Sequence, residues 1–261
     1  MILNKIRSLC SAPYLCVLSP KLFALSLIFV FSCNKSADIN GNKAFVSFTH
    51  YAYNVNPLTL EINGDTVFSA IPFDSATGYP YVTVTSQISN TSIFEQNNVD
   101  TFLTGFSSFR QGAYYSIYIY DTLNALGANS KSMIILQDNP PLNSDTTVSI
   151  RYMNFSPSPF GLLLVNTRAD SLAIDTVSFF PESFVGYNPN PAAYTFQTLL
   201  AGNYNIFAYL DSARPTSDSS NFRYLGNYPI SVLYNYNFNL LGFTNVDTGL
   251  YKLQLKTVPL N

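Results

Sequence analysis

The chain reads Leu58-Thr59-Leu60-Glu61-Ile62-Asn63-Gly64 and then continues through Asp65 into a second β-rich run, residues 66–71. Asparagine and glycine both tolerate positive φ, so the Asn63-Gly64 pair is the strongest two-residue hairpin turn in the sequence. The runs on either side of the pair have the length of strands. This stretch predicts a β-hairpin.

Short runs rich in β-branched and aromatic residues continue on both sides of the hairpin. Residues 79–86 alternate, with Tyr81, Thr83 and Thr85 on one face and Val82 and Val84 on the other, which predicts a strand with one buried side. No stretch of eleven or more residues shows a convincing 3.6-residue period, so we expect little helix. The strands expected in the first half are 44–48, 58–62, 66–71, 79–86, 92–94, 101–106, 114–120 and 132–136.

The clearest break in the chain is Asp138-Asn139-Pro140-Pro141-Leu142-Asn143-Ser144, because consecutive prolines cannot lie within a central strand. The sequence after the break repeats the first half in kind, with strands expected at 147–152, 161–165, 178–180, 194–200, 204–210, 221–225 and 229–238. We therefore expect two tandem antiparallel β-sandwich domains of the immunoglobulin-like kind, at residues 44–139 and 147–261, joined by a proline-rich linker at residues 140–146.

The N-terminal 32 residues have the features of an export signal. Basic residues precede Leu22 to Phe31, a run of ten residues without a charge, which is shorter than the ~20 residues of a spanning helix. Ser32 then precedes Cys33, and the segment resembles the lipobox of bacterial lipoproteins, which implies that Cys33 carries lipid and anchors the protein to a membrane. We expect a signal peptide at residues 1–32 and a flexible tether at residues 33–43. A plain signal peptide and an uncleaved anchor helix stay as alternatives.

Removal of this leader makes the protein more acidic. It takes Lys5, Arg7 and Lys21 from the 13 basic residues and none from the 15 acidic ones, so the formal net charge moves from −2 (13 − 15) to −5 (10 − 15). A weakly charged acidic chain offers no basic surface, so we expect no nucleic-acid partner. Cys10 and Cys16 lie in the leader and Cys33 is the predicted lipid carrier, so no disulfide and no cysteine metal site is available to the rest of the chain.

The sequence offers little catalytic chemistry. His50 is the only histidine, and its place at a tyrosine-rich strand end favours a packed or solvent-facing ring over a general base. Metal binding by histidine and cysteine is excluded for lack of ligands, and the three glutamates, Glu61, Glu95 and Glu182, are scattered. We expect no enzymatic activity, no metal and no cofactor.

One strand alternates aromatic and amide side chains. In the run Tyr234-Asn235-Tyr236-Asn237-Phe238 the rings would lie on one face of a strand and the amides on the other. Rings beside amides can stack on and bond to sugars, so these residues are candidates for glycan contact. The alternative, which the absence of tryptophan favours, is that the rings fill a core and the amides face water.

Aspartate is followed at once by serine or threonine at ten of its twelve positions. Seven of these pairs continue with a small or aliphatic residue or with threonine, and they are similar to the O-glycosylation triplet of Bacteroidetes proteins. The hydroxyl residues of the seven triplets are Thr66, Ser75, Thr122, Thr146, Ser171, Thr176 and Ser212. The alternative is that Asp-Ser and Asp-Thr are ordinary turn and strand-entry pairs. Both interpretations predict that the triplets lie at exposed loop ends.

The second half carries a recognisable motif. It opens with Thr147-Val-Ser-Ile-Arg151-Tyr-Met-Asn154-Phe-Ser156-Pro157 and later reads Ala201-Gly202-Asn203-Tyr204. These residues resemble the bacterial family named domain of unknown function 4397, whose members open with a strand that ends in Arg-x-x-Asn-x-Ser-Pro. The first half departs from the motif, with Ser47 in place of Arg151 and His50 in place of Asn154.

The resemblance implies an exported two-domain β protein, commonly a lipoprotein of Bacteroidetes-type bacteria, without an assigned activity. We expect an outer-membrane lipoprotein on the surface or the periplasmic face, which acts as a binding or structural module with a glycan or an envelope protein as partner. The alternative is a carbohydrate-binding accessory protein that uses the tyrosine and asparagine strand. The sequence leaves the oligomeric state open.

Overall fold

The structure is a computed structural model, and it describes residues 43–53, 55–83, 88–97, 101–123, 129–167, 176–179, 194–210, 222–242 and 252–260. The predicted signal peptide lies outside these residues, as does the predicted tether apart from Lys43, where the first strand begins. Strands fill the described part of the chain, and it contains no helix. This confirms the predicted all-β class.

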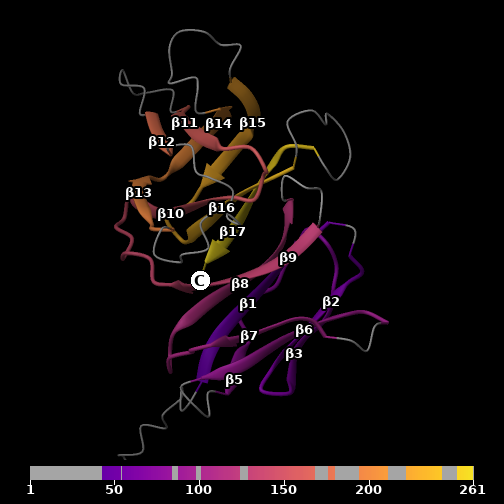
Figure 1. Cartoon of the computed structure of the whole chain (residues 1–261). Helices are drawn as coiled ribbons and strands as arrows, with labels where there is room; N and C mark the ends of the chain where they lie inside the picture. The colour runs from indigo at the N-terminus through magenta and orange to yellow at the C-terminus, as the bar shows by residue number, and fades with distance from the viewer. Residues whose placement is uncertain are drawn as a thin grey trace, which may run out of the picture. The chain divides into compact units, whose positions relative to one another are not determined.

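The first half forms two sheets (Figure 1). The first inner sheet contains β1 (Lys43–Tyr51), β4 (Ser75–Ala76), β5 (Tyr81–Thr83), β8 (Tyr114–Leu123) and β9 (Asn129–Asp138). The first outer sheet has the order β3-β2-β6-β7 and contains β2 (Leu58–Ile62), β3 (Asp65–Ile71), β6 (Ser89–Glu95) and β7 (Thr101–Ser107). The predicted hairpin joins β2 to β3, with φ of 56° at Asn63 and 86° at Gly64.

The second half also forms two sheets. The second inner sheet has the order β13-β10-β16-β17 and contains β10 (Thr147–Asn154), β13 (Gln197–Leu200), β16 (Asn235–Leu241) and β17 (Gln254–Leu260). The second outer sheet has the order β12-β11-β14-β15 and contains β11 (Phe160–Asn166), β12 (Thr176–Phe179), β14 (Gly202–Leu210) and β15 (Phe222–Ile230).

Three of the differences from the expected strands change the architecture. First, β1 pairs with β8 and β10 pairs with β16 in parallel, so the inner sheets are mixed and not wholly antiparallel. Second, residues 229–238 are not one strand, because β15 ends at Ile230 and a turn separates it from β16 at Asn235. Third, β17 was not expected, although it occupies the place that β9 has in the first half.

Each pair of sheets encloses its own apolar core. In β8, Tyr115, Ile117 and Ile119 point into the core between the first two sheets. In β16, Tyr236 and Phe238 point into the core between the other two. The side chains at the alternate positions of these central strands are also buried, so both faces of each inner sheet are covered.

The two halves have the same strand order, and a pair of turn residues fixes their alignment. The His50 Nδ1 atom accepts the backbone N–H of Ala52 at 3.2 Å, and the Asn154 Oδ1 atom accepts that of Ser156 at 2.9 Å. His50 and Asn154 therefore occupy equivalent positions, three residues after Ser47 and Arg151. The hydroxyls of Tyr115 and Tyr236 each accept the backbone N–H of the residue five positions earlier, so these two tyrosines are also equivalent. The residues that follow them, Ser116 and Asn237, lie opposite Ser47 and Arg151, which agrees with the alignment.

Candidate functional site

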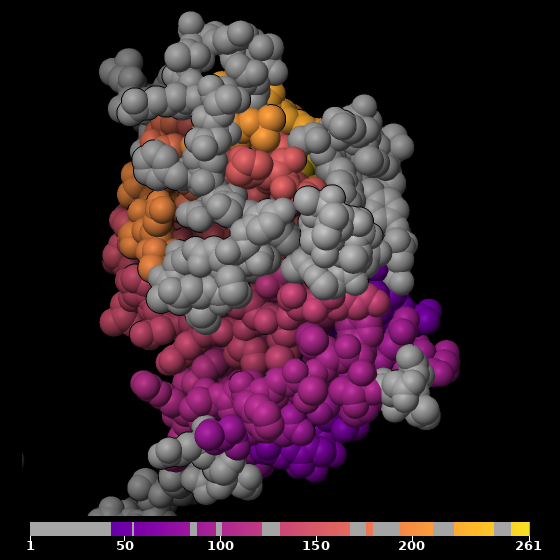
Figure 2. All heavy atoms as spheres, in the orientation of Figure 1, coloured from indigo at the N-terminus to yellow at the C-terminus, as the bar shows by residue number. Residues whose placement is uncertain are grey.

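In each half, one face of the inner sheet packs on the outer sheet of that half. The opposite faces of the two inner sheets pack against each other, and we call this contact the joint. Its apolar part joins two groups of buried side chains. The first half supplies Tyr51, Tyr118, Tyr120, Ile134 and Leu136, and the second half supplies Met153, Phe155, Tyr194 and Leu241. Residues Asn42–Asn261 form one compact unit, and the atoms of the two halves adjoin in the space-filling view (Figure 2).

Pairs of equivalent residues meet at the centre of the joint. Tyr51 and Phe155 each come directly after the aligned residues His50 and Asn154, and their ring centroids lie 5.2 Å apart. Asn239 donates to the Tyr51 hydroxyl at 3.0 Å, and in the mirrored contact the Tyr118 ring lies 5.3 Å from that of Phe155. The joint thus has an approximate two-fold arrangement, in which the same face of each half contacts the other.

A buried ion pair crosses the joint. Arg151 of β10 is 1% exposed and pairs with the carboxylate of Asp138, the last residue of β9. Its Nε also donates to the Asn237 side chain at 2.9 Å, and its guanidinium lies over the Phe196 ring at 4.8 Å from the centroid. Such a pair is stable only when hydrogen bonds satisfy the groups that have left water, as they do here.

The Asp138 carboxylate is held by the first half as well. Its Oδ2 accepts hydrogen bonds from the Ser116 hydroxyl at 2.7 Å and from the Tyr79 hydroxyl at 2.9 Å. Burial raises the pKa of the Tyr79 hydroxyl above its ordinary value, so this group stays protonated and remains a donor. Asp138 therefore works as an anchor for Arg151, with its oxygens already bonded.

The amides of β16 complete the polar part of the joint. Asn237 donates to the Tyr118 hydroxyl at 2.7 Å, and burial raises the pKa of Tyr118 to about 12. Both Asn237 and Asn239 are fully buried. The alternation of rings and amides in this strand therefore reflects burial on both sides: Tyr236 and Phe238 fill the core of their own half, and Asn237 and Asn239 bond to the first half.

This geometry corrects the predicted glycan-contacting run. Tyr236 is 8% exposed and Asn237 is 0% exposed, so neither side chain is accessible to a sugar. Asn235 is half-buried and accepts the Ser149 backbone N–H at 3.0 Å. Tyr234, at 39%, keeps the most exposed side chain of the run, and a single ring does not make the predicted stacking surface. The amides do not face water either, contrary to the alternative.

The motif residues have structural roles. Arg151 forms the joint, and Asn154 holds the turn after β10, because its Nδ2 donates to the Ser158 carbonyl at 2.6 Å while its Oδ1 accepts the Ser156 N–H. Ser156 is fully buried and Pro157 is half-buried in the same turn. The turn directs the chain from the inner sheet into β11 of the outer sheet.

His50 holds the equivalent turn of the first half. Its ring is fully buried, and its edge meets the Phe73 ring at 5.9 Å between centroids. Burial lowers the pKa of His50 to about 4, so the imidazole is neutral near pH 7. Among the described residues, no group of three or more His, Cys, Asp and Glu side chains is placed to hold a metal ion.

The triplet residues fall in several environments. Thr66, Thr146 and Thr176 are exposed, and Ser75 is half-buried in β4. Asp121 and Thr122 lie within β8, where Asp121 is buried and accepts the Tyr53 backbone N–H at 2.7 Å, so this triplet is not at a loop end as predicted. Ser171 and Ser212 lie outside the described residues, as does Cys33.

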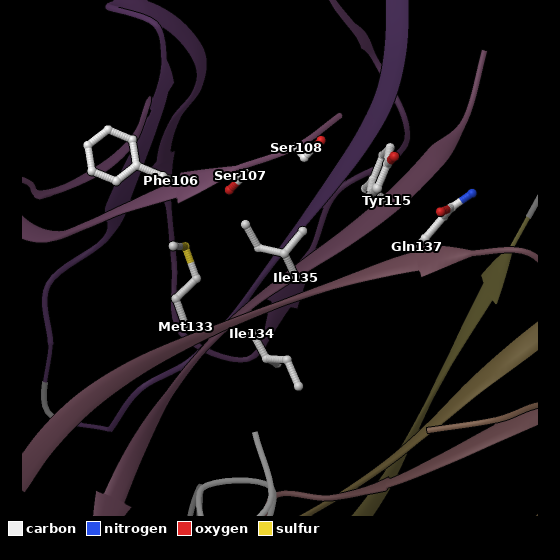
Figure 3. Close-up of a pocket in the computed structure, with 8 residues that line it drawn as sticks. All are labelled: Phe106, Ser107, Ser108, Tyr115, Met133, Ile134, Ile135 and Gln137. Carbon is white, nitrogen blue, oxygen red and sulfur yellow. The ribbon is translucent and has the colours of Figure 1, made fainter. Parts of the chain in front are cut away.

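A groove of about 440 Å³ opens between β7 and β9, the edge strands of the first two sheets (Figure 3). Met133 and Ile135 point from β9 toward β7, whereas Ile134 points to the other side, into the joint (Figure 3). Ser107, Ser108, Tyr115 and Gln137 complete the walls, and Phe106 stands at the rim with 81% of its surface exposed. The lining carries no charged side chain.

The sequence did not reveal the partners of Arg151. Asp138 was read only as the first residue of the break after the first half, and Tyr79, Ser116 and Tyr118 were read as ordinary strand residues. The available signal was an arginine within an apolar strand, because a charge at such a position needs a buried partner. No sequence pattern indicated the groove between β7 and β9.

Comparison with known proteins supports a family but gives no activity. Residues 44–159 match the family model described as "Domain of unknown function (DUF4397)". The matched region runs from β1 through the Arg151 motif at the start of the second half. No curated protein matches. No helix among the described residues is long and apolar enough to cross a membrane.

One similar solved structure is a leucine-rich repeat protein from Bacteroides thetaiotaomicron. The match has 11% sequence identity and a TM-score of 0.20, and it covers 73% of this chain. The chain spans about a quarter (24%) of the length of that protein.

Proposed function

We propose that this chain is a lipid-anchored protein of the cell envelope that acts as a non-catalytic binding or structural module. The observation that carries the non-catalytic role is the joint. Its polar groups form one chain of contacts under full or nearly full burial, in which Arg151 pairs with Asp138 and Asn237 bonds to both Arg151 and Tyr118. Groups already satisfied in this way hold two halves together and have no free position for a substrate.

The second half is proposed as a second copy of the domain whose family model matches residues 44–159. Three observations support this: the same strand order, parallel central pairs at equivalent positions, and the equivalent turns at His50 and Asn154. The N-terminal segment and the motif together favour a lipoprotein of Bacteroidetes-type bacteria.

Lipid attachment is tested by metabolic labelling with an alkyne-bearing fatty acid in a bacterium that processes lipoproteins. Wild-type protein is expected to take up label, and Cys33→Ala to lose it. Cys10→Ala and Cys16→Ala are the matched controls, since both residues lie in the proposed leader and should leave labelling unchanged. Label retained in Cys33→Ala would refute the anchor.

The membrane face is tested by protease treatment of intact cells. Loss of the mature band on intact cells would indicate a surface protein, with a glycan or another cell-surface molecule as partner. Protection until the outer membrane is opened would indicate a periplasmic protein, with an envelope protein as partner.

O-glycosylation of the exposed triplets is proposed as a modification of this envelope protein. It is supported by the exposure of Thr66, Thr146 and Thr176. A fall in mass after chemical deglycosylation, absent in the triple alanine variant, is the expected result. An intact mass equal to peptide plus lipid would overturn it.

A further inference from the structure

The outer face of the second outer sheet carries aromatic rings and amide groups side by side. In β14, alternate side chains pack into the core of the second half, and Asn205 and Phe207 lie between them on the opposite face. The neighbouring strand β15 (Figure 1) places Asn227 opposite Asn205 and Tyr224 opposite Phe207. We call these four residues the platform. None of them carries a charge.

A β-bulge brings the two β15 residues onto the same face. Tyr224 and Asn227 are three residues apart, so a regular strand would place their side chains on opposite faces. The register shifts between Ile206 and Phe207, because Gly226 lies opposite Ile206 whereas Tyr224 lies opposite Phe207. One extra residue in β15 therefore restores the outward direction of the Tyr224 side chain.

Hydrogen bonds within the platform fix the direction of its amides. The Asn205 Oδ1 atom accepts the Asn227 Nδ2 at 3.1 Å and the Tyr224 hydroxyl at 3.4 Å. The other polar groups of the two amides are the Asn205 Nδ2 donor and the Asn227 Oδ1 acceptor, and neither has a hydrogen-bond partner among the described residues. A donor beside an acceptor matches two adjacent hydroxyl groups, since a hydroxyl can both donate and accept.

The rings of the platform supply an apolar surface next to these amides. Tyr224 is 55% exposed, and its ring centroid lies 5.4 Å from that of the half-buried Phe207. The bond from its hydroxyl to Asn205, on the neighbouring strand, holds the ring over the face of the sheet. A sugar ring has an apolar face that can stack on such a ring while its hydroxyl groups reach polar groups at the side.

The first half keeps the bulge but not the platform. Its register shift between Ile93 and Phe94 corresponds to the shift in the second half. Counted from this shift, Phe94 takes the place of Phe207, and small hydroxyl side chains take the other three places. The residues at the positions of Tyr224, Asn205 and Asn227 are, in that order, Thr101, Ser92 and Thr104. The fold thus accepts small residues here, and the second half alone carries the exposed ring and the amide pair.

We propose that the platform binds a neutral sugar unit of a glycan. The apolar face of the sugar would rest on Tyr224, and two adjacent hydroxyl groups would bond to the Asn205 Nδ2 and Asn227 Oδ1 atoms. This inference rests on the binding role proposed above and gives that role a class of ligand. Its test does not involve the lipid anchor, so a failure here leaves the result on Cys33 unaffected.

Titration calorimetry of the full chain with cellohexaose tests the proposal. This probe is a neutral chain of glucose units, each with apolar ring faces and adjacent hydroxyl groups. The matched probe is cellohexaose with methylated hydroxyl groups, which keeps the rings and removes the hydroxyl donors. The protein is produced in a host that does not glycosylate the triplets, so that it brings no sugar of its own. Cellohexaose is expected to bind saturably, and the methylated probe about tenfold more weakly.

The variants copy the first half. Tyr224→Thr should weaken the binding of cellohexaose about tenfold by removing the stacking ring, and the double variant Asn205→Ser/Asn227→Thr should weaken it by a similar factor. Both should unfold at nearly the temperature of the wild type, because the first half has these residues at the equivalent positions. Tyr81→Thr is the matched control, since Tyr81 is 57% exposed and lies in β5, outside the platform. It should bind like the wild type.

Three results would overturn the proposal. The first is a wild-type protein that binds neither probe, or binds both equally. The second is cellohexaose binding that is as strong in Tyr224→Thr and in the double variant as in Tyr81→Thr. The third is a wild-type dimer in analytical ultracentrifugation that Tyr224→Thr dissociates, since a second copy of this chain would then cover the platform.

Discussion

Replacing His50 by asparagine should make the protein more resistant to acid. His50 is the only histidine, it is fully buried, and its Nδ1 accepts the Ala52 N–H at the end of β1. The second half performs the same task with Asn154, whose Oδ1 accepts the Ser156 N–H. The substitution His50→Asn therefore keeps the hydrogen bond that the fold uses and removes the titrating group. It also removes the ring contact with Phe73, a loss that does not depend on pH.

The magnitude follows from the two pKa values of the imidazole. Burial lowers the pKa of His50 from 6.5 to about 4 in the folded protein; the negative charge of Glu95 opposes this change and the positive charge of Lys131 adds to it, both less strongly. A base whose pKa is lowered by folding stabilises the native state fully above pH 6.5, and this contribution is lost as the pH falls toward 4. The loss is about 2 kcal/mol at pH 5 and approaches about 3 kcal/mol below pH 4.

Urea unfolding of both proteins at a series of pH values between 7.5 and 4 measures this difference. The free energy of unfolding of the wild type should fall more steeply than that of His50→Asn, by the amounts given above. Subtracting the two curves removes contributions shared by both proteins, such as that of Asp121, whose pKa is raised by burial. Parallel curves for the two proteins would refute the reasoning.

Three further predictions concern the joint, the linker and one close approach. Arg151→Met should reduce the free energy of unfolding by about 3–5 kcal/mol, because Asp138 is left buried without its partner. The double variant Arg151→Met/Asp138→Leu should recover part of this loss in the same urea assay, and equal losses in both variants would contradict the prediction. Asn143→Ala should reduce the free energy of unfolding by about 1 kcal/mol and speed proteolysis near residues 140–146, since the Asn143 amide donates to two backbone carbonyls of the turn before β16. An unchanged cleavage rate would count against a fixed linker. Gly161→Ala should lower stability by about 1–3 kcal/mol in thermal or urea unfolding, because the new Cβ would lie 2.5 Å from the Tyr209 ring, and a neutral effect would show that this contact relaxes freely.

Local patterns predicted the strands well where the signal was contained within a few residues. Leu58–Ile62 matches its prediction residue for residue, and in β5 Val82 is buried between exposed Tyr81 and Thr83, as the alternation indicated. The Asn63-Gly64 turn depends on two residues alone. The parallel pairing of β1 with β8 could not be read in the same way, because the two strands lie far apart in the sequence and each is buried on both faces.

The site was harder to predict because the role of each residue depends on a partner that lies far away in the sequence. The asparagines of β16 suggested either a sugar-binding surface or a solvent face, since a strand pattern shows that two faces differ but does not show what covers each one. Asn237 bonds to Tyr118, 119 residues earlier in the chain, and Asn239 to Tyr51, 188 residues earlier.

The approximate two-fold arrangement of the joint has a consequence for its electrostatics. An interface between two identical domains repeats every contact across its axis, so an arginine paired with an aspartate would occur twice and bring four charges out of water. In this chain the position equivalent to Arg151 is Ser47, and the strand registers place Leu260 at the position of Asp138. Covalent linkage has therefore freed the two faces to differ. The halves share one fully buried ion pair, at half the desolvation that strict symmetry would demand, and a second pair between them, Lys256 with Asp74 at 2.6 Å, is partly exposed.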